Sequence, residues 1–229
     1  MEIQYHPLKD KINEFLNKFV GKEIVIKANI GDGDVTYEGK DAVGSILEEL
    51  MVGYLTKKFK HLEEGQTSTP GDIVDRKNDW KLELKAFTKS ANFDVYDIPK
   101  FFGKSLSKEN WLAEAMHKTD YLIFEYYFDP NKKRILKSVS YKKLHEILGY
   151  AGKHHISVQY SGGVYKKIRP SSSTKTWTDK TKTPEEFVKY LLKLIKKLPE
   201  DLTGNQTELK KMITKQFGDL KKEISKNGE

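Results

Sequence analysis

The sequence predicts a single α/β domain. Segments with the 3.6-residue apolar period of helices alternate with segments of β-prone residues, and neither an internal repeat nor a long linker divides the 229 residues. The composition, with 37% hydrophobic and 11% aromatic residues, is enough to build a hydrophobic core, and the length suits one large domain or two small ones.

The first half of the chain predicts two helices and a strand. Apolar residues at helical spacing predict helices over residues 7–20 and 41–60, with a loop rich in Gly and Asp between them. Residues 80–87 alternate in polarity, which predicts a half-buried strand. Its faces are Trp80, Leu82, Leu84 and Ala86 on one side and Lys81, Glu83, Lys85 and Phe87 on the other.

The second half predicts two hairpins and several helices. Asp129-Pro130-Asn131 connects a strand over 121–128 to another over 134–141, and Ser161-Gly162-Gly163 joins strands over 156–160 and 164–168. Helices are predicted over 109–118, 141–148, 183–198 and 207–225. The helix at 183 begins with the capping-box spacing Thr183-Pro184-Glu185-Glu186.

Composition excludes several classes of protein, and charge suggests a partner. The absence of cysteine excludes disulfide frameworks, cysteine-ligated zinc sites and thiol nucleophiles. No stretch reaches the roughly 18 apolar residues of a membrane span and no signal-peptide pattern is present, so we expect a cytoplasmic protein without a membrane partner. Residues 1–130 carry 18 basic and 23 acidic side chains, net −5, and residues 131–229 carry 23 and 10, net +13. The basic half indicates either a nucleic-acid partner or lysine-rich solvated helix faces.

The segment from Pro70-Gly71-Asp72 to Glu83-Leu84-Lys85 carries the most chemistry. On a strand, Glu83 and Lys85 project from the same face, and Asp72 can meet Glu83 if it begins a paired strand. Two carboxylates with a backbone carbonyl are the oxygen ligands that Mg²⁺ prefers, and an adjacent ammonium can stabilise charge that builds on a phosphorus atom. The alternative is an ordinary solvated pair of charges.

Four patches of the chain resemble, in the same order, the PD-(D/E)xK nucleases, and among them the mismatch-repair endonuclease MutH and related restriction enzymes that cut GATC sites. Asp72 with Glu83-Leu84-Lys85 resembles the motif itself, and the segment 41–48 is similar to the glutamate-bearing helix of MutH. Met116-His117-Lys118 and the segment 163–171 are similar to two later patches. The resemblance covers about residues 41–175 and implies a restriction-endonuclease-like central mixed β-sheet flanked by helices.

The resemblance also implies an active site that uses Mg²⁺. The catalytic residues that it implies are Glu48, Asp72, Glu83, Lys85 and Lys118. The metal ligands are Asp72, Glu83 and the Leu84 backbone carbonyl, with Glu48 on a second ion or on water. Because the gap from Asp72 to Glu83 is longer than in MutH, Asp75 and Asp79 remain alternative ligands, and Glu49 competes with Glu48.

The basic half is expected to recognise DNA. We expect a catalytic part over about residues 41–128 and a DNA-recognition and basic helical part over about residues 131–229, within one domain spanning 1–229. The candidates for DNA contact are Tyr160, Lys167, Arg169, Ser171, Ser172, Ser173, Thr174, Lys175 and Trp177. Lysines of this half would neutralise phosphates, while side chains entering a groove would read bases.

These inferences predict a type II restriction endonuclease. It would be sequence-specific and Mg²⁺-dependent and would hydrolyse double-stranded DNA to 5′-phosphate and 3′-hydroxyl ends, as a homodimer when it cuts both strands. One alternative is a MutH-like mismatch-repair enzyme that nicks one strand and answers to a MutL-like partner. The other is a non-catalytic nucleic-acid-binding protein in which Asp72, Glu83 and Lys85 are only a surface charge cluster.

Overall fold

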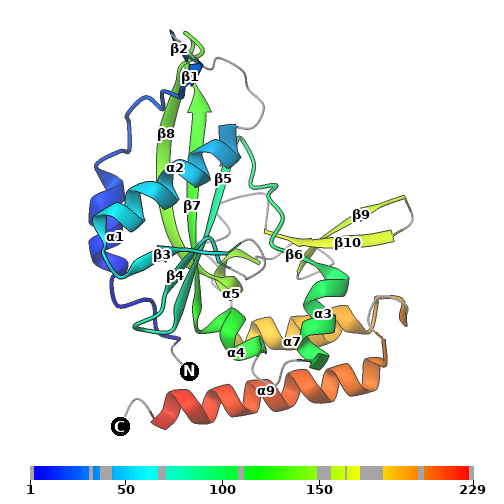
Figure 1. Cartoon of the computed structure of the whole chain (residues 1–229). Coiled ribbons are helices and arrows are strands. Elements are labelled where there is room, and N and C mark those ends of the chain that lie inside the picture. Colours follow the sequence, from blue (N-terminus) through cyan, green and yellow to red (C-terminus); the bar gives the residue numbers. More distant parts are fainter. Residues whose placement is uncertain are drawn as a thin grey trace. The chain divides into compact units, whose positions relative to one another are not determined.

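A computed structural model describes residues 3–30, 33–36, 43–66, 71–107, 111–148, 156–162, 164–170, 183–200 and 204–226. The chain forms two compact units, each described separately below (Figure 1). The sheet unit comprises His6–Lys89 and Asp120–Lys142, and the helical unit comprises Met1–Tyr5, Ser90–Thr119 and Lys143–Glu229. Among the described residues, no helix is long and apolar enough to cross a membrane.

A five-stranded sheet in the order β3-β4-β5-β7-β8 organises the sheet unit. Its strands are β3 (Leu62–Glu64), β4 (Ile73–Asp75), β5 (Trp80–Thr88), β7 (Thr119–Phe128) and β8 (Arg134–Lys143). The unit also contains α1 (Lys9–Asn17), α2 (Val43–Lys58) and a hairpin of β1 (Lys27–Ile30) with β2 (Gly33–Thr36). Strands β5 and β7 are neighbours, although the chain between them contributes residues 90–118 to the helical unit.

Helix α2 packs on β5 and β3 through residues spaced four apart. The buried stripe contains Val43, Leu47, Met51 and Leu55, with Val52 beside it. The apolar spacing of the sequence also predicts Leu50 and Tyr54 on this face, but their side chains are 41% and 51% exposed. The expectation is wrong for these two because the stripe follows the i, i+4 rows of the helix and reaches Leu55 instead of Tyr54.

Strand β5 alternates as predicted over most of its length. Leu82 and Leu84 are fully buried, whereas Glu83 and Lys85 on the other face are half-buried. The expected alternation is wrong at the end of the strand, where Phe87 is buried and Ala86 is half-buried. Both faces are covered there, because Ala86 lies against Gly44 of α2 while Phe87 points the opposite way.

Two buried aspartates attach the start of the sheet unit to its strands. Asp120 Oδ2 accepts hydrogen bonds from the His6 backbone N–H (2.8 Å), Trp80 Nε1 (3.0 Å) and the Tyr141 hydroxyl (2.8 Å). The ring Nδ1 of His6 accepts from the Leu8 N–H, so Nε2 carries the proton and donates to the Oδ2 atom of Asp75 at 2.9 Å. These bonds satisfy polar groups that would otherwise be costly to bury.

The helical unit combines a small sheet with helices that pack on α9. Its helices are α3 (Ile98–Ser107), α4 (Trp111–Met116), α5 (Leu144–Ile147), α7 (Pro184–Ile195) and α9 (Gln206–Lys226). Its sheet has the order β6-β10-β9, with β6 (Tyr96–Asp97), β9 (Ser157–Ser161) and β10 (Val164–Arg169). Helices α3, α4 and α7 contact α9 (Figure 1). The predicted hairpin and the capping box of Thr183 with Glu186 are both confirmed.

Stability should fall as the pH decreases below about 6.5. Burial lowers the pKa of His117 and of His145 to about 4, and it lowers the pKa of His6 despite the bond to Asp75. At these histidines the unfolded chain therefore binds protons between pH 6.5 and about 4 that the folded chain does not, which makes unfolding easier. Glu48, whose pKa burial raises to about 7, acts in the opposite direction, but His117 and His145 together outweigh it. For His117 and His145 the loss approaches about 3 kcal/mol each at the lower end of this range.

Urea unfolding at about pH 7 and about pH 5 measures this dependence. The His145→Gln variant should show a shallower loss of stability than the wild-type chain, because it lacks one group that protonates only on unfolding. A free energy of unfolding that stays constant across the range would contradict the burial argument.

Candidate active site

The register of the β4–β5 hairpin places two carboxylates opposite each other. Ile73 pairs with Leu82 and Asp75 pairs with Trp80 in an antiparallel ladder, and residues 76–79 form the turn. When the same register is continued by one residue, Asp72 stands across from Glu83. The ten residues between Asp72 and Glu83 therefore form one short hairpin. Asp72 directly precedes a strand that pairs with β5, which is the arrangement that the sequence required for Asp72 to approach Glu83.

Strand β5 continues past the end of β4, and side chains take over its hydrogen bonds. The N–H groups of Leu82, Leu84 and Ala86 point to the same edge, but β4 pairs only as far as Leu82. Asp72 Oδ2 accepts from the Leu84 N–H at 2.6 Å, and Glu48 Oε1 accepts from the Ala86 N–H at 2.6 Å. These bonds fix the two carboxylates along one edge of the strand.

Two glycines allow the chain to approach Asp72 closely. The Gly65 N–H donates to the Asp72 carbonyl oxygen at 2.8 Å. A Cβ atom at Gly65 would lie 2.0 Å from the Gly71 carbonyl oxygen, so no larger residue fits without a shift of the backbone. Gly71 has a φ of 99°, a region that other residues rarely adopt.

Lys85 is a cation held by Glu83. Its Nζ atom lies 2.6 Å from Glu83 Oε1, and both side chains are mostly shielded from solvent. Burial lowers the pKa of the Lys85 ammonium, but Glu83, Asp72 and Glu48 outweigh this, so its pKa lies above the usual value. Lys85 therefore carries a proton at neutral pH and can orient water and stabilise negative charge.

The carboxylates of the site fit a divalent cation by their chemistry. Burial raises the pKa of Glu48 to about 7; Lys85 and the Ala86 N–H oppose this shift, while the charges of Asp72 and Glu83 add to it. Three carboxylates thus face one ammonium.

Since N–H and C=O groups of one residue point to the same strand edge, the Leu84 carbonyl faces the edge that carries Asp72. Among the described residues, no group of three or more acidic or histidine side chains has the arrangement of a complete metal site.

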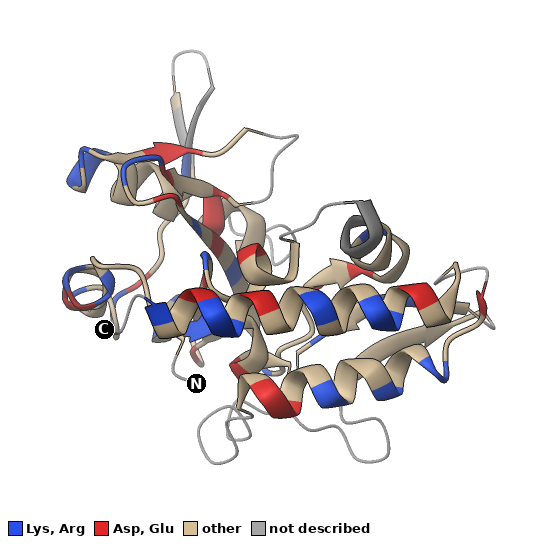
Figure 2. Ribbon diagram, turned by 90° about the horizontal axis from the view of Figure 1, so that it is seen from below, with Lys and Arg blue, Asp and Glu red and all other residues tan. Residues whose placement is uncertain are grey.

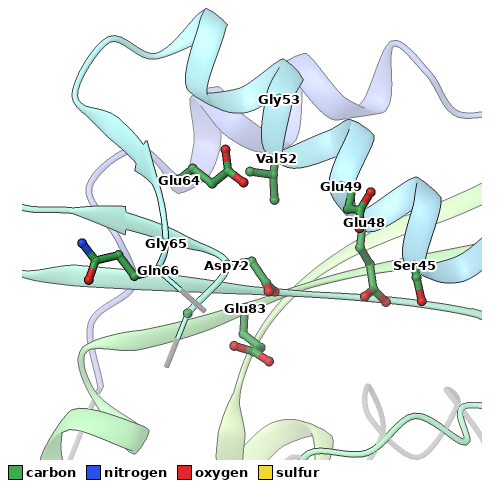
Figure 3. Close-up of a pocket in the computed structure, with 11 residues that line it drawn as sticks. Ser45, Glu48, Glu49, Val52, Gly53, Glu64, Gly65, Gln66, Asp72 and Glu83 are labelled. Atoms are coloured by element: carbon green, nitrogen blue, oxygen red, sulfur yellow. The ribbon is translucent and has the colours of Figure 1, made fainter. Parts of the chain in front are cut away.

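A pocket of about 620 Å³ opens beside these carboxylates. Figure 3 shows Glu48 extending from α2 toward the strands that carry Asp72 and Glu83. Sequence reasoning missed three polar residues of its lining, Ser45, Glu64 and Gln66. Glu64 is the last residue of β3 and pairs with Ile73, so recognising β3 would have been the signal that places Glu64 and Gln66 here.

The structure separates the alternative aspartates from Asp72. Asp75 is fully buried and accepts hydrogen bonds from His6 and from the Lys77 and Asn78 backbone. Asp79 is exposed in the hairpin turn, with a φ of 51°. Only Asp72 of these three lines the pocket with Glu83.

The remaining catalytic candidates are placed differently. Glu49 is exposed and lines the pocket beside Glu48, whereas the Glu48 carboxylate accepts a hydrogen bond from the backbone of β5. Lys118 belongs to the helical unit, between α4 and β7, and is half-buried. The structure therefore brings Glu48, Asp72, Glu83 and Lys85 together within the sheet unit.

The candidates for DNA contact that the structure describes lie on the β9–β10 hairpin. Arg169 and Lys167 are on β10, and both make ion pairs with Asp94, at 3.0 Å and 2.5 Å. Tyr160 on β9 is 60% exposed, and its ring stacks in a tilted manner on Tyr165 at 4.8 Å between centroids. Ser171, Ser172, Ser173, Thr174, Lys175 and Trp177 lie outside the described residues.

The known proteins to which this chain is similar are restriction endonucleases. The family model of the NgoBV restriction endonuclease matches residues 5–226. The type II restriction enzyme NlaIV of Neisseria lactamica is 30% identical over 175 residues, which cover 71% of this chain and 70% of that protein. The type II restriction enzyme NgoBV of Neisseria gonorrhoeae is 29% identical over 110 residues, or 43% of this chain and 63% of that protein.

A solved structure shares the fold. The structure of the NlaIV restriction endonuclease matches with a TM-score of 0.74 and 24% identity, and the match covers 95% of this chain and 91% of that one. The expected restriction-endonuclease-like fold, with a central sheet flanked by helices, is thereby confirmed.

Proposed function

Because this chain belongs to the family of the NgoBV restriction endonuclease and is a type II restriction endonuclease, we propose that Asp72, Glu83 and Lys85, assisted by Glu48, form its active site. The observation that carries the proposal is the hairpin register that sets Asp72 opposite Glu83 beside Lys85. Because the matching family and relatives are restriction endonucleases, the alternatives of a strand-nicking repair enzyme and of a non-catalytic binding protein are not favoured.

The site suits Mg²⁺ as the cofactor. Asp72, Glu83 and the Leu84 carbonyl would bind it, and Glu48 would bind a second ion or a water molecule. Bound Mg²⁺ supplies charge stabilisation on phosphoryl oxygens and lowers the pKa of water. Lys118 is proposed as an accessory residue on the strength of the motif resemblance alone.

The residues of the chain would position the reactants for in-line hydrolysis. The Lys85 ammonium would orient the attacking water beside the scissile phosphate and stabilise the charge that develops there. The water oxygen forms a bond to phosphorus as the bond to the 3′ oxygen breaks, and the 3′ oxygen takes up a proton. The products would be a 5′-phosphate and a 3′-hydroxyl.

Incubation with plasmid DNA tests the proposal directly. In Mg²⁺ we expect supercoiled plasmid to become linear at fixed sites, with EDTA abolishing the reaction, and sequencing of the ends should identify the recognition site. Linear product without a persistent nicked form would support a homodimer that cuts both strands. We expect this reaction in the cytoplasm, where the DNA substrate is. Cleavage at full rate in EDTA would refute the metal-dependent site.

We propose that the sheet unit cuts DNA and that the helical unit recognises it. A groove between α7 and α9 supports the second role, and Figure 2 shows basic residues, drawn blue, along both helices among acidic ones, drawn red. The basic residues of these two helices are all lysines. Its charged lining residues are Lys196, Lys210, Lys211, Lys215, Asp219 and Lys222. Five lysines against one aspartate suit the phosphate backbone of DNA.

Removing two of these lysines should weaken the salt dependence of DNA binding. The double variant Lys196→Gln, Lys211→Gln should reduce the slope of log K against log salt by about 2, since each phosphate contact contributes about 0.9. Fluorescence anisotropy with a labelled duplex at several salt concentrations measures the slope. The matched control is Lys11→Gln on α1 with Lys18→Gln directly after it, and equal slopes for the two double variants would contradict the proposed contacts.

A further inference from the structure

One carboxylate holds two of the three basic side chains of β10. Asp94 accepts from Lys167 Nζ through Oδ2 at 2.5 Å and from Arg169 Nε through Oδ1 at 3.0 Å. Lys167 and Arg169 are two residues apart on one strand, and about a third of each side chain is exposed. None of the sequence patterns singled out Asp94.

The backbone around Asp94 is fixed to the same strand. The Val95 N–H donates to the Ile168 carbonyl oxygen at 3.0 Å, and Tyr96 and Asp97 of β6 pair with Ile168 and Lys167. The Tyr96 ring then packs against the ring of Phe101 at 5.2 Å between centroids. Asp94 and the strand that carries Arg169 therefore form one rigid support, and the carboxylate is in a set position relative to β10.

The bond to Asp94 constrains the direction of the Arg169 guanidinium. A guanidinium has five N–H donors in one plane, and Asp94 takes the one on Nε. The four N–H donors on the two terminal nitrogens lie on the other edges of that plane and remain directed away from Nε. Because the bond at Nε restricts rotation of the guanidinium, these terminal donors have a fixed orientation. Two parallel hydrogen bonds to guanine O6 and N7 require such an orientation.

We infer that Asp94 is a positioning residue that orients Arg169 for reading a base, and that base discrimination by this enzyme depends on the Asp94–Arg169 pair. The inference rests on the proposed role of the helical unit in DNA recognition, with Arg169 as the residue of that unit that reads a base. Lys167, the second partner of Asp94, has a single point charge and suits a phosphate rather than a base edge. Discrimination should therefore depend on the bond to Arg169 and affinity on the charge of Lys167.

The test compares cleavage of the correct site with cleavage of altered sites. The substrates are a duplex that carries the site at which the wild-type enzyme cuts plasmid DNA, and duplexes in which one base pair of that site is replaced. The readout is the ratio of kcat/KM for the correct and altered duplexes. Loss of one bidentate contact reduces discrimination at one base pair by about five- to 150-fold.

Four variants separate positioning from folding. Arg169→Ala and Asp94→Ala should each lower discrimination at the same base pair by at least about fivefold, and the double variant should be no worse than Arg169→Ala alone. Asp94→Asn keeps an acceptor oxygen for Nε and should retain part of the discrimination, a partial rescue that unfolding would not produce. Asp97→Asn is the matched control, since Asp97 lies three residues away and pairs with Lys100 instead.

The outcomes are distinguishable. If Arg169→Ala leaves discrimination unchanged, the proposed readout by Arg169 fails and the inference fails with it. If Arg169→Ala lowers discrimination and Asp94→Ala does not, the proposed function stands and the positioning role is overturned. If Asp94→Ala strengthens binding to all duplexes equally with no change in discrimination, Asp94 only masks positive charge, and the inference is likewise overturned.

Discussion

Lys85→Met should reduce the rate of DNA cleavage by about a thousandfold or more, while leaving DNA affinity within a few-fold of wild type. Methionine keeps most of the hydrocarbon length of lysine but has no charge. The Lys85 ammonium stays protonated at neutral pH because Glu83, Asp72 and Glu48 surround it. Its removal takes away the group that we propose orients water beside the scissile phosphate.

Single-turnover cleavage of a duplex and fluorescence anisotropy of the same duplex measure rate and affinity separately. Lys81→Met is the matched control, because Lys81 lies on the same strand and four residues away, and its cleavage rate should stay close to wild type. A Lys85→Met protein that cuts at the wild-type rate would refute the proposed role. Loss of cleavage together with loss of the folded state would be detected by circular dichroism.

Asp72→Asn should affect the cleavage rate and not stability, whereas Asp75→Asn should affect stability and not the cleavage rate. Asp72→Asn should lower the cleavage rate by about a thousandfold and leave stability nearly unchanged, because asparagine keeps an oxygen for the Leu84 N–H. Asp75→Asn should lower the free energy of unfolding by about 3 kcal/mol, because it removes a fully buried charge that accepts several hydrogen bonds.

Urea unfolding and cleavage rates, both at about pH 7, measure the two effects in one pair of experiments. The folded fraction of Asp75→Asn should cut DNA at close to the wild-type rate. If Asp75→Asn is instead inactive but stable, Asp75 and not Asp72 would be the metal ligand.

The predicted part of the site followed from periodicity in one long strand. From Trp80 to Lys85, β5 shows the alternation that sets Glu83 and Lys85 on one face, so their proximity could be inferred without a partner strand. The position of Asp72 depended on pairing, and β4 is only three residues long, too short for a period of two to be read. The same limit concealed β3, and with it Glu64.

Other features depend on contacts between residues distant in the sequence. Asp94 and Arg169 are 75 residues apart, and no local pattern marks an aspartate whose partner lies on a strand that far along the chain. The burial of Asp75 likewise depends on His6, 69 residues earlier. Helix α3 was not foreseen, since Pro99 and Gly103 weaken its helical pattern.

The proposed catalytic residues Glu48, Asp72, Glu83 and Lys85 come from one short, continuous stretch of chain within the first segment of the sheet unit. Every segment from Ser90 to Thr119 and beyond Lys143, including Asp94 and Arg169, belongs to the other unit. In evolutionary terms, this arrangement would let mutations accumulate around the strand that we propose reads bases without disturbing the hairpin that we propose cuts. A lineage could thus change its target sequence while it inherits the same chemistry.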